Sequence, residues 1–244
     1  MQSINSLAIF GLLSLFFAAV APADVVISQW HLLTGVQDFG DPSEQDGAWF
    51  DSVENPFDAE HAVALPPPPE PPYMASHVAY DFWWEGNSAS FDVDIDHQFE
   101  VHIEDSRSSF ATGWLYLTTT VDLTLTADAF YTYAFPPAAS SYSHMKFRVA
   151  DVDNGENLFS QTEFGGTIWL EPPSATLALA TTLTLPAGRE YFIQYRFGLD
   201  TFDNSAPGEW TTAFGSVSWT LRPVPEPATI SLLALAAAPL LRPR

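Results

Sequence analysis

Between Phe91 and Glu104 the chain reads FDVDIDHQFEVHIE, with apolar and polar residues alternating at almost every position. A period of two places alternate side chains on opposite faces of a β-strand, whereas a helix would scatter the same residues around its circumference. The stretch is therefore predicted to be a strand with one face on a core and the other in water. Asp92, Asp94 and Asp96 belong to the solvated face. His97 interrupts the apolar face and is expected to be a core histidine with a backbone partner.

The same alternation recurs in about ten segments, which are separated by turn signals rich in Gly, Pro and Asn. No long segment with a helical period occurs between the two ends of the chain. Many short antiparallel strands predict an all-β protein, an antiparallel β-sandwich or jelly roll, with short hydrophobic helices at both ends. We expect the first and last strands of this body to pair side by side. The other clear segments are 24–34, 77–84, 120–127, 129–135, 144–159, 175–200 and 213–223.

The stretch 35–75 does not alternate. It is acidic and rich in turn residues, and it ends in a run of prolines around Glu70, which predicts polyproline II. Too few residues precede this stretch to form a domain of their own. It is therefore expected to be a stiff surface excursion within a single domain that covers residues 24–223.

The segment DVDNGE, from Asp151 to Glu156, has two interpretations. Its aspartates resemble half of a calcium-binding loop, but the remaining ligand spacing of such a loop is missing. Asn154-Gly155 between two alternating segments is a strong signal for a β-hairpin turn. The hairpin is favoured, and no metal site is predicted.

The charge balance excludes several classes of partner and site. The chain carries 30 acidic residues against 8 Lys and Arg, a net charge of −22. Such a surface repels nucleic acids and anionic membranes, so neither is expected as a partner. The absence of cysteine excludes disulfides, thiolate metal sites and cysteine nucleophiles. No cofactor is predicted.

Residues 1–23, MQSINSLAIFGLLSLFFAAVAPA, carry a short apolar run that is rich in small residues. This composition is typical of a secretory signal peptide rather than of a membrane span. Small side chains at Ala21 and Ala23 predict cleavage by signal peptidase before Asp24, because the competing cut would leave Pro22 in the peptidase site. A buried N-terminal helix is the alternative.

A second apolar run, Ala228–Leu241, lies near the C-terminus. As a helix its 14 residues span roughly 21 Å, less than the hydrocarbon core of about 30 Å. Pro239 interrupts the run, which further disfavours a permanent membrane anchor. Arg242 and Arg244 are expected to hold the end of the chain on the cytoplasmic side.

The motif Pro225-Glu226-Pro227 stands just before this run. Together with the apolar helix and the terminal arginines, the tail 224–244 resembles the PEP-CTERM sorting signal of exported bacterial proteins. The resemblance implies recognition by an exosortase-like membrane protease, transient membrane anchoring, and delivery to the cell surface or extracellular matrix. A plain membrane anchor is the alternative.

No catalytic motif is visible in the body of the chain. It contains no phosphate-binding glycine loop, metalloprotease helix or Gly-x-Ser-x-Gly elbow, and the six histidines never form a close ligand pair on a helix. Pairs of carboxylates could serve a secreted hydrolase, but acids are too abundant for any pair to be informative. An enzyme is therefore not expected. A structural or adhesive role after export is the favoured function.

Exposed aromatic side chains support an alternative function, a lectin-like module that binds extracellular polysaccharide. An aromatic ring covers the apolar face of a pyranose while polar neighbours bind its hydroxyl groups. Alternation along 77–84 predicts that Trp83 points outward, beside Asp81 and Glu85. Further aromatic candidates are Trp114, Tyr116 and Tyr142.

Overall fold

The computed structural model describes residues 25–38, 43–50, 57–65, 73–85, 88–100, 106–137, 139–169, 171–204 and 208–225. The predicted signal cleavage site (Ala21, Ala23, Asp24) and most of the sorting tail (Glu226, Pro227, Arg242, Arg244) lie outside these residues. The predicted terminal helices and the predicted polyproline II segment lie outside them as well. The strands are β1 Val25–Asp38, β2 Ser43–Phe50, β3 Phe57–Leu65, β4 Met74–Glu85, β5 Ser88–Glu100, β6 Arg107–Thr119, β7 Leu123–Ala134, β8 Ala139–Asp151, β9 Glu156–Gly165, β10 Ser174–Leu185, β11 Arg189–Asn204 and β12 Trp210–Pro223.

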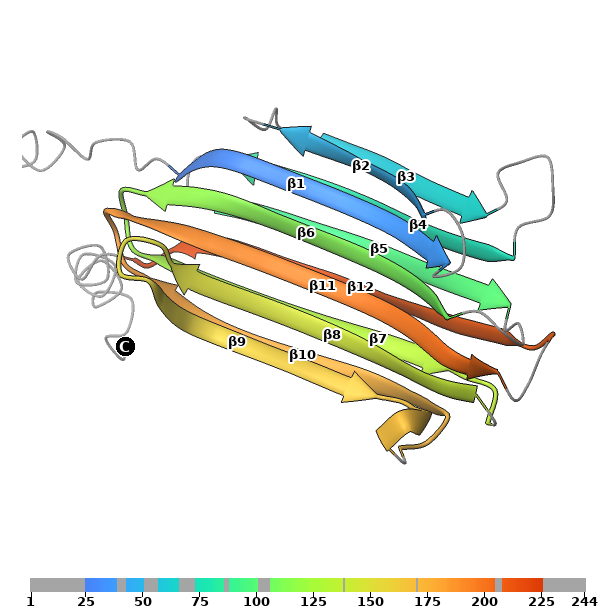
Figure 1. Cartoon of the computed structure of the whole chain (residues 1–244). Helices are drawn as coiled ribbons and strands as arrows, with labels where there is room; N and C mark the ends of the chain where they lie inside the picture. The colour runs from blue at the N-terminus through green and yellow to red at the C-terminus, as the bar shows by residue number, and fades with distance from the viewer. Residues whose placement is uncertain are drawn as a thin grey trace, which may run out of the picture.

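The strands form two antiparallel sheets of six strands each that face one another as a sandwich (Figure 1). Sheet A has the order β2-β1-β6-β11-β8-β9, and sheet B has the order β10-β7-β12-β5-β4-β3. The prediction of an all-β, antiparallel sandwich is confirmed. The expected count of about ten strands was too low.

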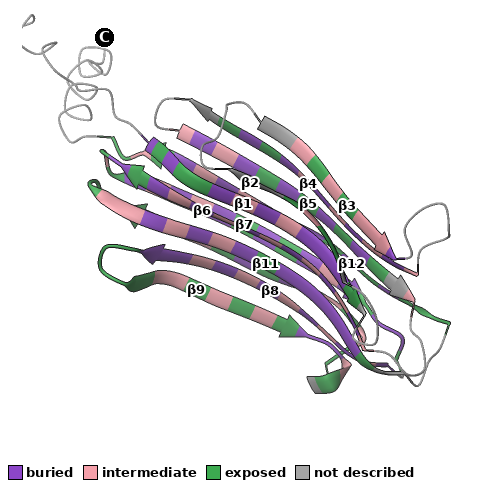
Figure 2. Cartoon of the chain, turned by 45° about the horizontal axis from the view of Figure 1, so that its top comes forward, coloured by how far each residue is buried: buried purple, intermediate pink, exposed green. Residues whose placement is uncertain are grey.

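Alternation along the strands sets which side chains enter the core. Phe91, Val93 and Ile95 are buried, whereas the intervening aspartates Asp92 and Asp94 are exposed. Figure 2 shows the same banding of buried and more exposed residues along β6, β11 and β8. Between the sheets, large aromatic side chains pack in edge-to-face, tilted and stacked pairs. This aromatic cluster comprises Trp30, Tyr80, Phe82, Phe91 and Trp219.

His97 is fully buried in this core, as expected. Its partner is a side chain rather than a backbone group, because Nδ1 lies 2.6 Å from the hydroxyl oxygen of Tyr131. Burial lowers the pKa of His97 to about 3, and repulsion from His144 adds to the effect. The imidazole is therefore neutral at pH 7.

Two strands, β2 and β3, form within the stretch that was expected to be irregular surface chain. β2 pairs with β1 at the edge of sheet A, and β3 pairs with β4 at the edge of sheet B. Of the side chains described on β2, Glu44, Gln45 and Gly47 are exposed and Asp46 is half-buried, so these positions carry no apolar alternation. An edge strand that buries little surface lacks the alternation by which strands are recognised in sequence.

The first and last strands do not pair, contrary to expectation. β1 lies between β2 and β6 in sheet A, whereas β12 lies between β7 and β5 in sheet B. The connection from β11 to β12 crosses from one sheet to the other and places the closing strand in the middle of the opposite layer.

The segment Asp151–Glu156 forms the turn between β8 and β9, which confirms the predicted hairpin. Gly155 has a φ of 69°, a conformation that favours glycine. The acids of this segment bind protein groups: Asp151 pairs with Arg189 at 2.6 Å, and Asp153 accepts a hydrogen bond from the backbone N–H of Glu190 at 2.9 Å.

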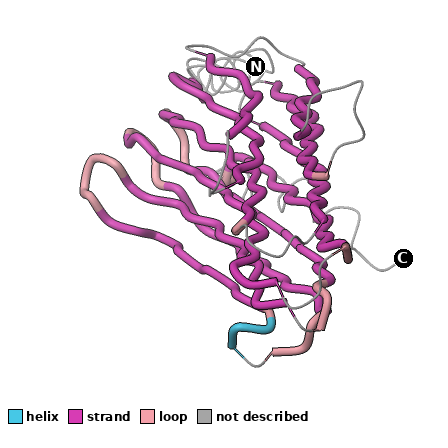
Figure 3. Tube along the Cα trace, turned by 45° about the vertical axis from the view of Figure 1, so that its right-hand side comes forward, coloured by secondary structure: helices cyan, strands magenta, loops and turns pink. Residues whose placement is uncertain are grey.

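Helix is almost absent from the described part of the chain, where Figure 3 shows strands throughout and a single short helix. That helix, η1, covers Thr167–Trp169 after β9. Within the described ranges, no helix has both the length and the apolar character needed to cross a membrane.

Candidate functional site

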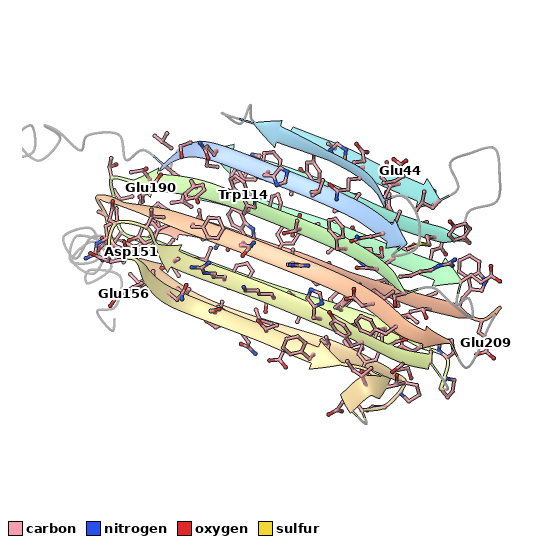
Figure 4. All side chains as sticks on the ribbon, viewed as in Figure 1. Glu44, Trp114, Asp151, Glu156, Glu190 and Glu209 are labelled. Atoms are coloured by element: carbon pink, nitrogen blue, oxygen red, sulfur yellow. The ribbon has the colours of Figure 1, made fainter. Side chains whose placement is uncertain are left out.

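The outer face of sheet A carries the densest group of aromatic and cationic side chains that point away from the core. Antiparallel pairing sets these side chains in rows across the sheet. One row runs from His31 on β1 through Trp114 on β6 and Gln194 on β11 to Arg148 on β8. Figure 4 labels Trp114 on this face, which is turned toward the viewer.

Three rings from two strands form the first part of the site, which we call the Trp114 cluster (Trp114, Tyr116 and Phe192). Tyr116 and Phe192 are register partners, and their ring centroids lie 5.0 Å apart. Trp114 lies 5.6 Å from Tyr116 and 6.2 Å from Phe192. All three side chains are half-buried, so each ring keeps part of its surface in solvent.

Three cations follow along the strands, and we call them the cationic group (Lys146, Arg148 and Arg196). The Arg148 guanidinium lies 5.6 Å from the Phe192 ring centroid, and its Nε donates to Asn157 at 2.7 Å. Arg196 on β11 is the direct register partner of Lys146 on β8. The group therefore begins at the Trp114 cluster and extends along β8 and β11.

A second aromatic group, the Tyr142 cluster (Tyr142, His144, Phe164 and Phe202), lies beyond the cations. Tyr142 stacks on Phe202 at 5.5 Å and on His144 at 5.8 Å, and His144 lies 6.4 Å from Phe164. Phe164 and Phe202 are each about half exposed. This cluster offers further ring surface to a ligand on the same face.

A buried carboxylate, Asp200, fixes the position of Tyr142. It accepts hydrogen bonds from Ser108 and Tyr142, and it lies 3.8 Å from Nδ1 of His144. Burial raises the pKa of Asp200 above its ordinary value even though these hydrogen bonds act in the opposite direction. Burial, followed by the charge of Asp200, raises the pKa of Tyr142. The phenol is therefore a hydrogen-bond donor at neutral pH.

The ring of His144 lies across β11 at Gly198, where a Cβ atom would overlap it. Burial lowers the pKa of His144 to about 4, and the charges of Arg196 and Lys146 act in the same direction. At pH 7 the ring is therefore neutral and contributes an aromatic face rather than a positive charge.

This face can bind an extended ligand that has both apolar surfaces and polar groups. The two aromatic clusters provide ring surface, and the cations and Gln194 provide hydrogen-bond donors between them. From Arg148 to Tyr142 on β8 the strand advances six residues, about 20 Å. Among the described residues, no group of three His, Asp or Glu side chains could hold a metal ion.

The residues predicted from alternation along β4 lie on the other sheet. Trp83 is 42% exposed on the outer face of sheet B, as predicted, and Asp81 is exposed on the same face. The side chain of Glu85 lies outside what the structure describes. Asp81 lines a shallow hollow of about 320 Å³ with Glu60, Asp92 and Asp94. This hollow offers hydrogen-bond acceptors but few donors.

Sequence reasoning named Trp114, Tyr116 and Tyr142, and the structure places all three on one face. It did not name Phe192, Phe202 or the cationic group as parts of a site. The sequence does predict that the cationic side chains point outward, since Lys146 and Arg148 alternate with apolar residues, as do Gln194 and Arg196. The sequence does not show which strands are neighbours in the sheet, because β6, β11 and β8 are far apart along the chain.

No family model matches the chain, and no curated protein matches it. Solved structures that resemble it include the following three, and the resemblance is weak in each. A structure of promiscuous carbohydrate-binding modules of the β-sandwich superfamily is 10% identical, with 79% of this chain and 84% of that chain covered and a TM-score of 0.21. The isomalto-dextranase of Arthrobacter globiformis T6 in complex with panose is 10% identical over 80% of this chain, with a TM-score of 0.17. The chain spans 32% of that protein's length.

The third structure, infectious bursal disease virus of the Gt strain, is 8% identical, with 92% of this chain and 76% of that chain covered and a TM-score of 0.16. All three TM-scores lie far below 0.5, so these likenesses carry no argument about function.

Proposed function

We propose that this chain is an exported β-sandwich protein of the cell surface or extracellular matrix, where it binds polysaccharide through the outer face of sheet A. The observation that carries the proposal is the Trp114 cluster, in which rings from β6 and β11 lie side by side next to the Arg148 guanidinium. A structural or adhesive role follows if the bound polymer belongs to the surface or matrix.

The chemistry of a pyranose suits this arrangement. Its axial C–H groups form an apolar patch that packs on an aromatic face, and its hydroxyl groups need polar partners at the rim. Gln194 and Arg148 lie in the same row as Trp114 and supply such partners. All of these side chains stand on paired strands rather than on loops, so little conformational entropy is lost on binding.

Export and sorting form the second part of the proposal, and their support is in the sequence. The N-terminus is apolar and rich in small residues, including Ala21 and Ala23 near its end. Cleavage is predicted before Asp24. The C-terminal tail carries Pro225-Glu226-Pro227 ahead of an apolar run and terminal arginines. Signal peptidase and an exosortase-like protease are the processing partners under this proposal.

Sheet A is favoured over the hollow on sheet B because it offers rings and both kinds of hydrogen-bonding group. On sheet B, the exposed ring of Trp83 stands near the carboxylates of Asp81 and Asp92, which only accept hydrogen bonds. Sugar hydroxyls both donate and accept, so the mixed face satisfies more of them.

The proposal is tested by affinity electrophoresis of residues 24–223 through gels that contain a panel of neutral and acidic polysaccharides. We expect retardation by at least one polymer, and about tenfold weaker binding in the Trp114→Ala, Tyr116→Ala variant, since stacking on two rings is lost. Trp83→Ala is the matched control, because it removes an exposed tryptophan from the opposite sheet.

Tm values of both variants separate lost binding from lost folding, and Trp114→Leu provides a variant that keeps apolar cover over the sheet. Loss of binding in Trp83→Ala with normal binding in the Trp114 variants would move the site to sheet B. Failure of every polymer to retard the folded domain would reject polysaccharide binding altogether.

A further inference from the structure

We infer that the polysaccharide bound by sheet A is acidic, with carboxylate or sulfate groups that pair with Lys146, Arg148 and Arg196. The inference rests on the proposed function, since it names the ligand class of the same face. Two observations support the inference: the position of the few cations of the chain and the residues that surround them.

Cations are scarce in this protein, and sheet A gathers a large share of them. The chain has 8 Lys and Arg against 30 acids, and three of the 8 form the cationic group. Of the others, Arg107 is buried and Arg189 pairs with Asp151, whereas Arg222 lies on sheet B. The remaining two are the terminal arginines of the tail.

Arg196 and Lys146 stand directly opposite each other on neighbouring strands. Like charges in this position destabilise a sheet, and their usual partners would be carboxylates. The flanking positions of the row are Thr112 on β6 and Thr162 on β9, so neither neighbour neutralises them. Neither cation forms an ion pair with any residue that the structure describes.

The nearest carboxylate on this face, Asp200, is already occupied. It is buried and accepts hydrogen bonds from Ser108 and Tyr142. Asp200 also interacts electrostatically with Arg196, but no salt bridge joins these two described residues, so the exposed Arg196 and the half-buried Lys146 can still receive an anionic group. An anionic group on a ligand would relieve the repulsion between these two cations.

Arg148 links the cations to the aromatic surface. Its Nε is held by Asn157 at 2.7 Å, while its terminal nitrogens make no hydrogen bond to a described residue. The guanidinium lies over Phe192, a position that favours one planar orientation. A sugar stacked on the Trp114 cluster would thus place its acidic substituent next to two guanidinium nitrogens.

The spacing favours a polymer with repeated charges over a single small anion. The cations occupy two adjacent rows, about 7 Å apart along the strands, with the Trp114 cluster beside Arg148 and the Tyr142 cluster beyond Lys146 and Arg196. A nucleic acid also combines rings with anionic groups, but the net charge of −22 opposes so dense a line of phosphates. A uronic-acid polysaccharide carries one carboxylate per sugar ring, a wider spacing than the one charge per about 1.7 Å of duplex DNA, and it offers apolar C–H faces to the rings.

The experiment compares charged and neutral polymers that share a backbone. The pairs are polygalacturonate with its carboxyl-reduced form, and dextran sulfate with dextran, and oligo(dT) is included as the nucleic-acid probe. We expect at least about tenfold tighter binding to a charged member than to its neutral partner, and the preferred pair identifies carboxylate or sulfate as the recognised group.

Arg196→Gln should weaken binding of the charged polymer about tenfold, while its Tm stays the same or rises because the repulsion with Lys146 is removed. Arg222→Gln, which removes one positive charge from sheet B, should change binding less than twofold.

Equal binding of charged and neutral partners, or equal effects of the two substitutions, would overturn the acidic-ligand inference and leave the polysaccharide proposal intact. Tighter binding to oligo(dT) than to every polysaccharide would overturn both. Absence of binding to any polymer would reject the proposed function itself.

Discussion

Arg189 at the start of β11 holds the buried carboxylate of Asp151 at the end of β8, with a separation of 2.6 Å between Nη1 and Oδ2. Asn154 donates to the same carboxylate from its backbone N–H at 3.1 Å and from Nδ2 at 2.7 Å. Figure 4 labels Asp151 close to Glu190, whose N–H binds Asp153. The β8–β9 turn is thereby tied to a strand of sheet A.

Replacing Arg189 by leucine should lower the Tm by a few degrees, because Asp151 then stays buried without its cation. Burial alone raises the pKa of Asp151, but the hydrogen bonds from Arg189 and Asn154 outweigh it and lower the pKa below its ordinary value. A carboxylate whose pKa is lower in the folded chain than in the unfolded chain stabilises the fold at pH values above the unfolded pKa. This stabilisation is lost as the pH falls through the folded pKa.

Thermal melts at pH 7 and at pH 3 check this prediction. The difference in Tm between wild type and Arg189→Leu should be larger at pH 7 than at pH 3. Arg222→Leu is the control for loss of an arginine, and a similar Tm loss in both variants would argue against a specific role of the pair.

Calcium should affect the stability of the domain only weakly. The acids of the β8–β9 turn already bind Arg189, Asn154 and the N–H of Glu190. Differential scanning fluorimetry with millimolar calcium should therefore show a small change in Tm. A rise above about 10 °C would imply tight binding to the folded state and contradict this reading of the turn.

The domain should lose stability steadily between pH 6.5 and pH 4. The pKa values of His97 and His144 are about 3 and about 4, because burial disfavours their charged forms. The unfolded chain takes up protons near pH 6.5, whereas the folded state does not, so stability is complete above that pH and declines below it. Each histidine contributes about 1.4 kcal/mol per pH unit to the slope.

Urea denaturation at pH 7, 6 and 5 measures this slope. His144→Gln removes one of the two groups while keeping a polar side chain over Gly198, so its free energy of unfolding should decline less steeply with falling pH. Parallel slopes for wild type and variant would mean that His144 titrates alike in the folded and unfolded chains.

The core could be predicted from the sequence because alternate residues along each strand are buried. Phe91, Val93 and Ile95 reveal their inward direction by alternating with aspartates, and each strand in sheet interiors repeats that signal. The edge strands β2 and β3 were harder to recognise. β3 does turn Ala59, Val63 and Leu65 toward the core, but alanines and a histidine among its alternating positions make that pattern weak.

The site was only partly predictable, for a different reason. Trp114 and Phe192 are 78 positions apart in sequence, and their contact exists because β6 and β11 are neighbours in a sheet. Parity tells which way each side chain points, but strand order is a property of long-range pairing. The lone Trp83 was easier to name because its evidence lies within one strand.

Gly113 makes room for a core tyrosine, so adding a methyl group there should destabilise the domain by about 1–3 kcal/mol. A Cβ at this position would lie 2.6 Å from the hydroxyl oxygen of Tyr195, which is buried on β11. Urea denaturation of Gly113→Ala measures the cost. In the background of Tyr195→Leu the same substitution should cost less, and an undiminished cost in the double variant would show that Tyr195 is not the obstacle.

The final prediction concerns the tail. β12 lies between β5 and β7, and the strand ends at Pro223 before the Pro225-Glu226-Pro227 motif begins. The backbone N–H of Val224 still donates to the carbonyl of Asp122 at 2.8 Å. Changing the motif to three alanines should therefore leave the Tm of the domain unchanged, because the sheets are complete without these side chains.

The same variant should fail in sorting. Under the proposed function, the apolar run anchors the protein in the inner membrane only transiently. It is too short for a permanent span and is interrupted at Pro239, while the terminal arginines hold it in the membrane until it is cut. During that pause the stiff proline motif stands at the outer membrane boundary, where a membrane protease can reach it. Without the motif, the protein should accumulate in the inner membrane with its tail attached.

Fractionation followed by intact mass measurement distinguishes the two states, since under the proposed function the processed protein would lack the tail and would start at Asp24. Arg222→Ala, three residues before the motif, is the matched control and should be sorted like wild type. If the triple-alanine variant reached the surface at the normal rate and with the normal mass, the motif would have no part in sorting. The tail would then be an ordinary membrane anchor or a dispensable extension of the chain.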